Sequence, residues 1–222
     1  MTLKGKTMFK DREDAGKSLA RKLEDIVNKT TLVMAIPRGG VPVAAQIHQI
    51  LKVEMDLLIS RKLPFPENPE AGFGAVAEDG SVYLIPGILH MVSTALIRQI
   101  VAEQKSEIQR RIRVLRGGRQ LSDLTNRQVI LVDDGIAMGS TVMVSIRCCR
   151  NLGAAFVIVA VPVASPRASE FISGMTDQFI VLEKPSNFHA VARFYENWFD
   201  LSDRDVANIL DGIRLRRHFP EV

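Results

Sequence analysis

The sequence is poor in cysteine and has no long apolar stretch. Only two of its 222 residues are cysteine, Cys148 and Cys149. Neighbouring residues of a helix point in different directions, so a disulfide between these two is disfavoured. We therefore expect two reduced thiols and an intracellular protein. No segment approaches the ~20 apolar residues that a membrane-spanning helix needs, and the stretch 1–17 contains no apolar signal core. These absences predict a cytoplasmic protein without a membrane partner.

Several motifs of common site types are also missing. The sequence has no G-x-x-x-x-G-K-[ST] nucleotide-binding loop, no G-x-S-x-G elbow and no H-E-x-x-H zinc motif. Its four histidines are scattered without metal-ligand spacing. The segment 72–77, GFGAVA, matches G-x-G-x-x-A, but it follows a proline-rich stretch and opens no helix, so we reject it as a dinucleotide-binding motif.

What is present is the composition of an ordinary globular protein. Hydrophobic residues make up 46% and charged residues 24% of the chain, and 222 residues can bury a substantial core in one α/β domain. The net charge of +4 suits anionic ligands but does not establish nucleic-acid binding.

Helical and strand patterns alternate along the chain, which predicts a mostly parallel sheet flanked by helices. Strands are expected at 31–36, 53–60, 128–132, 154–164 and 178–183. Helices are expected after a cap at Asp11, over 41–51, 93–116 and 140–151, between the last two strands, and from a capping box at Ser202 onward. Residues 61–74 carry three prolines and two glycines and are expected to form a loop. A hairpin is expected around the turn 78–80.

The stretch 129–141, VILVDDGIAMGST, ends an apolar strand in two adjacent carboxylates, Asp133 and Asp134. In a doubly wound sheet ligands bind beyond the carboxyl ends of the strands, so these aspartates lie at the functional edge. The backbone N–H groups of the following loop, with the hydroxyls of Ser140 and Thr141 at a helix start, predict a phosphate cradle. A capped turn would explain Asp134-Gly135 alone but not the whole pattern. A sugar phosphate fits both halves.

This stretch resembles the signature of the type I phosphoribosyltransferases, in which a hydrophobic strand, two acidic residues and a small-residue loop bind 5-phosphoribosyl 1-diphosphate (PRPP). The resemblance implies that Asp133 and Asp134 bind the ribose 2- and 3-hydroxyls. It places the 5-phosphate among residues 137–141, which are Ala137, Met138, Gly139, Ser140 and Thr141, and it makes Gly135 a further PRPP-binding residue. Met138 stands where many members have Thr, which removes one hydroxyl donor and leaves the backbone N–H.

Two further segments carry the resemblance. AIPRGGVPVA, residues 35–44, resembles the family's diphosphate-binding loop, with Arg38 as a charged donor and Gly39 and Gly40 permitting close backbone approach. A simple strand-to-helix turn is the alternative. Arg61 and Lys62 stand where several members have basic residues on a mobile loop that closes over the diphosphate, although Lys62 also suits a solvated surface. The segment 61–80 is similar to an uncharacterised subgroup of predicted phosphoribosyltransferases.

The resemblance implies an α/β fold of type I phosphoribosyltransferase kind, with a central parallel sheet flanked by helices and a small hood. We expect a single domain over 1–222, with a core at about 30–183 and a hood at 184–222, to which 1–29 is a candidate addition. The implied activity is transfer of the phosphoribosyl group of PRPP to an unidentified nitrogenous acceptor, with release of diphosphate. A homodimer is also expected.

The resemblance also suggests how the reaction is supported. Arg38, Lys62, Asp133 and Asp134 are the expected catalytic residues. Mg²⁺ is expected near the two aspartates, held mainly by PRPP and water rather than by direct protein ligands. Glu78 and Asp79 are candidates for a general base from their position in a loop.

Two other functions stay open. The protein is alternatively a non-catalytic PRPP-sensing regulator that binds nucleic acid, because the arginines between 110 and 119 form a basic cluster. A solvated helix end that favours the helix dipole is the preferred interpretation of that cluster, so nucleic-acid binding is not expected. The other alternative is a degenerate structural member of the fold. The aromatic residues of 187–199 are expected mostly in the core, or lining a pocket that stacks on an aromatic acceptor.

Overall fold

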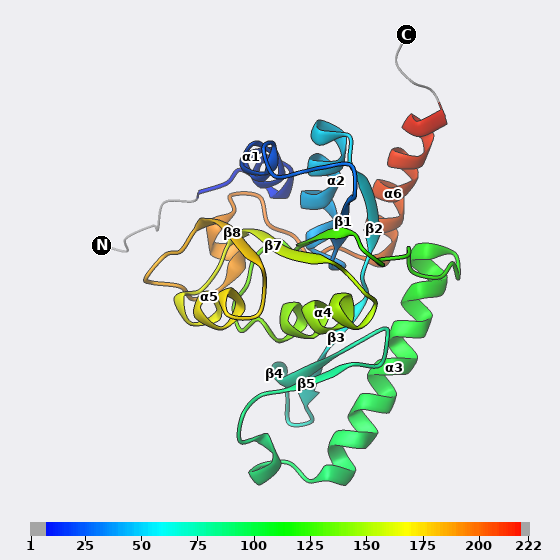
Figure 1. Cartoon of the computed structure of the whole chain (residues 1–222). Coiled ribbons are helices and arrows are strands. Elements are labelled where there is room, and N and C mark those ends of the chain that lie inside the picture. The colour runs from blue at the N-terminus through cyan, green and yellow to red at the C-terminus, as the bar shows by residue number, and fades with distance from the viewer. Residues whose placement is uncertain (1–7, 219–222) are drawn as a thin grey trace.

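The centre of the molecule is a parallel sheet of five strands in the order β2-β1-β6-β7-β8 (Figure 1). The structure is a computed structural model that describes residues 8–218, except the side chains of residue 70 and of residues 214–218. The strands are β1 (Thr31–Ala35), β2 (Glu54–Leu57), β6 (Gln128–Val132), β7 (Phe156–Val163) and β8 (Gln178–Glu183). The predicted parallel sheet is confirmed, and β6 and β8 have the predicted bounds.

Helices cover both faces of this sheet, as predicted. Helices α1 (Arg12–Leu23) and α2 (Gly40–Leu51) lie on one face, and α4 (Ser140–Asn151) and α5 (Pro166–Ser173) lie on the other. Successive residues of β1 alternate between the two layers, with Val33 in the core under α1 and α2 and Met34 in the core over α4. Because both faces are covered, the strand is apolar throughout, which explains why it was recognisable in the sequence.

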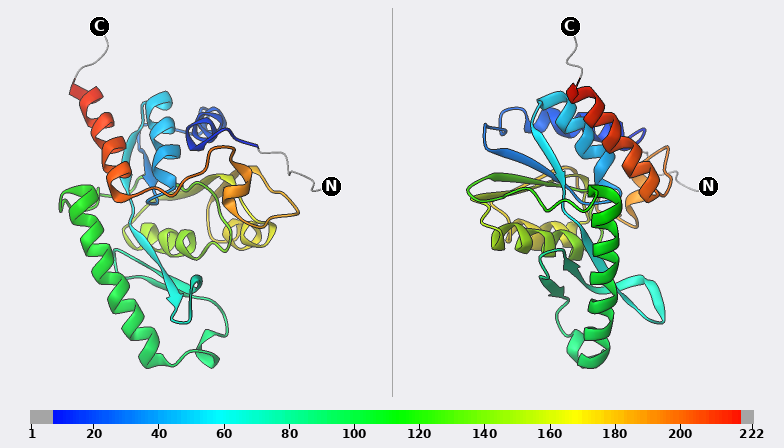
Figure 2. Two further views of the ribbon diagram at one scale, coloured as in Figure 1. Left: turned by 180° about the vertical axis from the view of Figure 1, so that it is seen from behind. Right: turned by 90° about the vertical axis from the view of Figure 1, so that its right-hand side faces the viewer.

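A second sheet of three antiparallel strands lies beyond α4, to one side of the first (Figure 2). Its strands are β3 (Ser60–Phe65), β4 (Asn68–Ala77) and β5 (Val82–Leu84), and it packs against the long helix α3 (Thr94–Arg116) after the 3-10 helix η1 (Ile88–His90). The predicted hairpin around 78–80 is confirmed, since Val76 pairs with Val82.

The predicted loop over 61–74 is wrong, because this segment forms β3 and most of β4. Its apolar residues Leu63 and Phe73 are fully buried. Proline is tolerated because β3 is an edge strand, and the register shifts around Pro64. The predicted strand 53–60 is accordingly two strands, since the chain leaves the parallel sheet after Leu57 and enters the second sheet at Ser60.

The two ends of the described chain lie on the core. Residues 8–10 run beside 194–197, near the 3-10 helix η2 (Val191–Phe194), and Phe9 and Tyr195 form a parallel bridge. Helix α6 (Asp203–His218) packs beside α2 and α3. Its capping box is confirmed, because Asp205 N donates to Ser202 Oγ at 3.2 Å and Ser202 N donates to Asp205 Oδ2 at 2.8 Å. The division into core and hood stays a prediction.

Both cysteines are free and buried in α4. Burial raises the pKa of Cys149 to about 12 and raises that of Cys148 as well, so both thiols are protonated at neutral pH. Among the described residues, no helix combines the length and apolar character needed to cross a membrane.

Candidate functional site

The loops that follow β1 and β6 begin side by side at the carboxyl edge of the parallel sheet. The two strands pair with Ala35 opposite Val132, and Ile36 N donates a hydrogen bond to Val132 O at 2.9 Å. The chain continues from β1 to β2 on one side of this pair and from β6 to β7 on the other. The pair therefore marks the switch point of the sheet, where ligands of doubly wound folds bind.

Two glycines let these loops touch. A Cβ on Gly39 would overlap the carboxylate of Asp134, and one on Gly40 would lie 2.9 Å from Asp133 Cα. Both positions therefore exclude a side chain. The sequence indicated that these glycines permit a close approach. The structure shows that these glycines approach the aspartate pair.

Arg12 of helix α1 forms a buried ion pair with Asp134. Arg12 Nε donates to Asp134 Oδ2 at 2.7 Å, and the two residues are only 6% and 9% exposed. The remainder of the guanidinium contacts the C-terminal segment: it donates to Phe199 O at 3.0 Å and stacks 3.8 Å from the Trp198 ring centroid. Tyr195 Oη donates to the backbone oxygen of Asp134 at 2.6 Å. Asp134 is thus held in place by helix α1 and by the segment 195–199.

Arg12 is a site residue that sequence reasoning missed. It lies on the buried face of α1 with Ala15, Leu19 and Leu23. A single arginine in the stripe that otherwise carries the apolar residues of a helix is the signal that could have found it, because such a charge needs a buried partner.

Asp133 has a different environment, because it is half-buried and faces an open pocket. Its pKa is raised well above the usual aspartate value by burial and by the neighbouring Asp134 charge. The pKa of Asp134 is raised by burial too, but the Arg12 charge opposes that rise. The two adjacent carboxylates are therefore distinct: Asp134 has an internal counterion and Asp133 is the one available to a ligand.

The pocket has a volume of about 410 Å³ and contains many of the predicted site residues. Its walls are Lys62, Ala71, Gly72, Asp133, residues 135–142 and Val191. Within the described part of the chain, none of the backbone N–H groups of residues 137–141 donates a hydrogen bond. Gly139 has a φ of 83° and precedes α4, so these amides lie at a helix start. Free amides at a helix start form a site for an anion.

Contacts with the corner after β7 hold this loop in place. Ile136 N donates to Val163 O at 2.9 Å, and Ser165 Oγ donates to Ala137 O at 2.7 Å. These bonds use carbonyl groups and the amide of Ile136, and so leave the amides of 137–141 available for a ligand.

The second sheet supplies the opposite wall. Lys62 of β3 and Gly72 of β4 both line the pocket, and a Cβ on Gly72 would lie 2.5 Å from Lys62 Cγ. The segment predicted to be a loop therefore borders the pocket as a β-ribbon.

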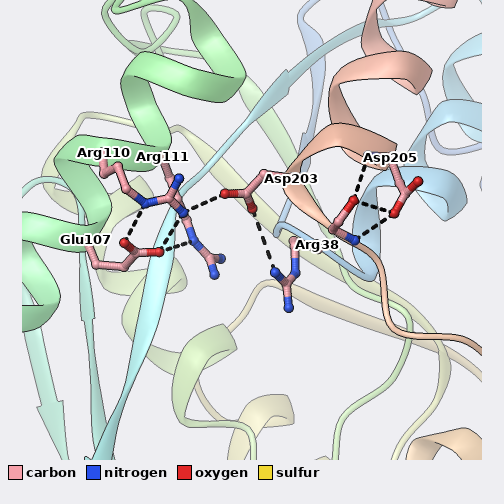
Figure 3. A network of polar contacts seen from close by, with 7 residues as sticks. Arg38, Glu107, Arg110, Arg111, Asp203 and Asp205 are labelled. Atoms are coloured by element: carbon pink, nitrogen blue, oxygen red, sulfur yellow. Dashed lines mark hydrogen bonds and ion pairs between the residues drawn. The ribbon is translucent and has the colours of Figure 1, made fainter.

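Arg38 and Arg61 do not line this pocket. Arg38 is exposed, with Nη1 3.8 Å from Asp203 Oδ1, and Arg61 Nε donates to Gln104 Oε1 of α3 at 3.0 Å. Both lie with Arg110 and Arg111 in a separate cluster, part of which Figure 3 shows (Figure 3). The structure thus divides the predicted cationic residues between two places.

The predicted solvated arginine cluster between 110 and 119 is wrong for two of its members. Arg111 and Arg116 are buried, and Arg116 forms an ion pair with Glu78. Arg110 is bound to Glu107 and Asp203. Arginines used inside the fold are not free to contact phosphates of a nucleic acid.

The candidate general bases and the aromatic residues of the C-terminal segment lie away from the pocket. Glu78 and Asp79 do not line the pocket: the first pairs with Arg116 and the second accepts from Ser81. None of the described aromatic side chains of 187–199 lines it either; Tyr195 is packed on Phe9 and Trp198.

Among the described residues no group of three or more His, Cys, Asp or Glu could hold a metal. Asp133 suits Mg²⁺, which binds one or two carboxylates together with substrate phosphates and water.

Residues 7–197 match the model of a protein family described as the phosphoribosyl transferase domain. Two Mycobacterium tuberculosis proteins, each named "Putative phosphoribosyl transferase", are 37% identical over 216 residues, which cover 96% of this chain and 48% of theirs. The chain thus spans about half the length of these curated relatives. The crystal structure of TT1426 from Thermus thermophilus is similar with a TM-score of 0.77 and 35% identity, over 91% of this chain and 97% of that one.

Proposed function

The chain belongs to the phosphoribosyl transferase family, and we propose that it binds PRPP with Mg²⁺ and transfers the phosphoribosyl group to a nitrogenous acceptor. One observation carries this proposal: a half-buried carboxylate, Asp133, and a loop of unbonded amides, 137–141, share the walls of a single pocket. A ligand that satisfies both needs hydroxyl groups and a phosphate at opposite ends, as a ribose 5-phosphate does.

The two aspartates take different roles in this proposal. Asp133 accepts hydrogen bonds from the ribose hydroxyls. Asp134 acts as a positioning residue, because its carboxylate is bound by Arg12 and its neighbour Gly39 leaves no space on the loop side. The amides of 137–141, with the hydroxyls of Ser140 and Thr141, bind the 5-phosphate.

In the proposed reaction the bond between the anomeric carbon and the diphosphate oxygen breaks, and diphosphate leaves with the electron pair. The acceptor nitrogen forms the new bond to that carbon and then loses its proton. Lys62, Arg38 and the amide of Gly39 neutralise charge on the departing diphosphate, and the Asp133 carboxylate stabilises positive charge on the sugar. Mg²⁺, held by PRPP, water and Asp133, would add charge neutralisation at the diphosphate.

The acceptor is expected at the wall formed by Val191, which lies in η2 of the C-terminal segment and lines the pocket. This segment belongs to the predicted hood. Formation of a homodimer and a cytoplasmic location stay predictions of the same proposal.

Calorimetric titration with PRPP, with and without Mg²⁺, tests the proposal. We expect saturable, Mg²⁺-dependent binding that weakens by about tenfold or more in Asp133→Asn, since a hydrogen-bonded carboxylate is lost. Asp25→Asn is the matched control, because Asp25 is exposed on the far end of the α1 region and absent from the pocket. Absence of binding at millimolar PRPP would refute the proposal. If PRPP binds, diphosphate release in a screen of nitrogenous bases identifies the acceptor.

A further inference from the structure

A second cavity lies at the edge of the parallel sheet, apart from the pocket at residues 137–141. It has a volume of about 450 Å³ and is bordered by β2, by the end of α3 with the chain that follows it, and by α6. Figure 1 shows these elements together at that side of the sheet. None of the described residues lines both cavities. Clefts of this size bind small organic ligands.

The wall formed by β2 exposes backbone groups, because β2 is an edge strand of the sheet. Leu58 N donates a hydrogen bond to Ala35 O at 3.0 Å, so the backbone groups of Leu58 face β1. Alternate residues of a strand direct their N–H and C=O groups to the same side. The backbone groups of Met55 and Leu57, which also line the cavity, therefore point away from β1.

The protein itself occupies the backbone groups on either side of Met55. Leu57 N donates to the side chain of the preceding aspartate at 2.8 Å, and Leu57 O accepts from Arg116 Nη1 at 3.3 Å. Before the strand, Val53 O is bonded to His48 Nδ1 at 2.6 Å. In the part of the chain that the structure describes, no group outside the sheet bonds to the N–H or C=O of Met55. One donor and one acceptor, side by side, are thus left for a ligand.

The charges around the cavity favour an anionic group on that ligand. Most of the charged side chains that line it have polar partners within the fold. The pairs are Glu54 with Arg127, Asp56 with Ser122, and Arg116 with Glu78. Arg119 is exposed and donates from Nε to Arg116 O at 3.1 Å, and no carboxylate of the described residues binds it. Its terminal guanidinium nitrogens are therefore available to a phosphate.

We propose that this cavity is a binding site for a nucleoside monophosphate, with the base paired to the backbone of Met55 and the phosphate bound by Arg119. Each nucleobase carries a neighbouring hydrogen-bond donor and acceptor on one edge, which match the C=O and N–H of a single residue. Leu115 of α3 and Leu210 and Ile213 of α6 supply apolar walls for the faces of the ring.

An extended peptide is the other kind of ligand that an open sheet edge can bind. Strand addition needs free backbone groups at alternate residues of the edge. Of the two outward-facing residues of β2, Leu57 is already bonded on both its N–H and its C=O. A planar ring needs one donor–acceptor pair, and one pair is what Met55 offers.

This site goes beyond the proposed function and does not depend on it. A nucleoside monophosphate also contains a ribose 5-phosphate, so it is expected to bind the pocket at 137–141 as well if the proposed function is correct. The two sites therefore need separate measurements. The Met55 amide is a probe of the edge cavity alone, since Met55 does not line the other pocket.

Hydrogen exchange followed by NMR, with AMP, GMP, CMP or UMP added in turn to the wild-type chain, tests the site. In the free protein the amide of Met55 should exchange at least about tenfold faster than that of Asp56, which faces β1. At least one of the four nucleotides should slow Met55 exchange by about tenfold or more, because the base accepts a hydrogen bond from that amide.

Met55→Pro removes the outward N–H without removing a hydrogen bond of the sheet, as proline at an edge strand allows. Calorimetry in an Asp133→Asn background, which weakens the other pocket, should show nucleotide affinity about tenfold lower in Met55→Pro. Met55→Leu is the matched control, because it keeps the N–H and the apolar side chain, and it should leave the affinity unchanged. Circular dichroism establishes that each variant is folded.

The phosphate contact has its own variant. Arg119→Gln in the same background should weaken nucleotide binding by about tenfold, since a charge-assisted hydrogen bond is lost. Arg113→Gln is its control, because Arg113 is an exposed arginine of α3 that does not line the cavity. This pair of variants keeps the inference testable even if Met55→Pro does not fold.

Met55 exchange that none of the four nucleotides slows overturns the inference. So does an affinity that neither Met55→Pro nor Arg119→Gln lowers. Slowing of Met55 exchange by higher protein concentration alone, without nucleotide, would show pairing of two copies at this edge and overturns it too. Met55 protection by a nucleotide, with no Asp133-dependent binding elsewhere, refutes the proposed function and supports the edge site.

Discussion

Arg12 Nε lies 2.7 Å from Asp134 Oδ2, and this ion pair joins helix α1 to the loop after β6 across most of the chain's length. It explains how a buried strand can end in two adjacent carboxylates. Arg12 neutralises the charge of Asp134, and Asp133 is the carboxylate that faces the pocket. The repulsion between the two charges is therefore reduced by a residue that no local motif contains.

Arg12→Met is expected to lower the free energy of unfolding by about 3 kcal/mol, because it leaves the Asp134 carboxylate buried without its counterion. Urea denaturation measures this change. Arg21→Met is the control: Arg21 is exposed on the same helix, so its replacement should change the free energy of unfolding by less than about 0.5 kcal/mol.

A double substitution separates the ion pair from general packing around Arg12. Adding Asp134→Asn to Arg12→Met removes the stranded charge, so the double variant should be more stable than Arg12→Met alone. Equal stability of the two variants would mean that Arg12 acts by packing on Trp198 rather than by pairing with Asp134.

Gly39→Ala is expected to abolish PRPP binding, because the new methyl group would overlap the Asp134 carboxylate and separate the two loops. Calorimetry measures the binding, and circular dichroism establishes that the variant is folded. Gly212→Ala is the matched control, since a Cβ there meets nothing within 4 Å and alanine favours the helix. PRPP affinity equal to wild type in Gly39→Ala would show that the loops can separate without loss of the site.

Local patterns were sufficient for the parallel sheet and its helices. Strands covered on both faces are continuously apolar, as in β1 and β7, and helices are delimited by local residues, such as the Ser202 cap and Gly117 in its left-handed conformation after α3. The aspartate loop was recognisable for the same reason. Its strand, acidic pair and small residues form one short segment whose elements need no distant partner.

Features that depend on distant partners were not predictable. The prolines and glycines of β3 and β4 predict a loop, because in the sequence they outweigh the two apolar positions that the structure buries, Leu63 and Phe73. Arg12 and Asp134 are 122 residues apart in the chain, so no local pattern contains both. The sequence places Arg111 at a solvated helix end, because helix periodicity does not reveal that the structure buries this residue.

The raised pKa of Asp133 predicts a pH dependence of stability. The folded state holds this proton up to a higher pH than the unfolded state, so the Asp133 contribution to stability falls as pH rises from the ordinary aspartate pKa to the raised one. Asp133→Asn should therefore be more stable than wild type at neutral pH, and the difference should shrink as pH falls toward about 4, where aspartate in an unfolded chain titrates. Thermal unfolding over this range, with Asp25→Asn as control, measures it. A difference that grows on acidification would show that the ionised form is favoured instead.

Met138→Thr tests how the loop binds phosphate. Met138 is 61% exposed and borders the pocket at the amides proposed for the 5-phosphate. A threonine hydroxyl there adds one donor, so ribose 5-phosphate should bind about three- to tenfold more tightly, as one net hydrogen bond allows. Because the side chain is exposed, the free energy of unfolding should change by less than about 0.5 kcal/mol. Met138→Leu supplies no donor and should leave the affinity unchanged, as should Met91→Thr, which adds a hydroxyl at a residue 73% exposed and absent from the pocket. Equal affinities in Met138→Thr and Met138→Leu would show that the phosphate is bound by the backbone alone.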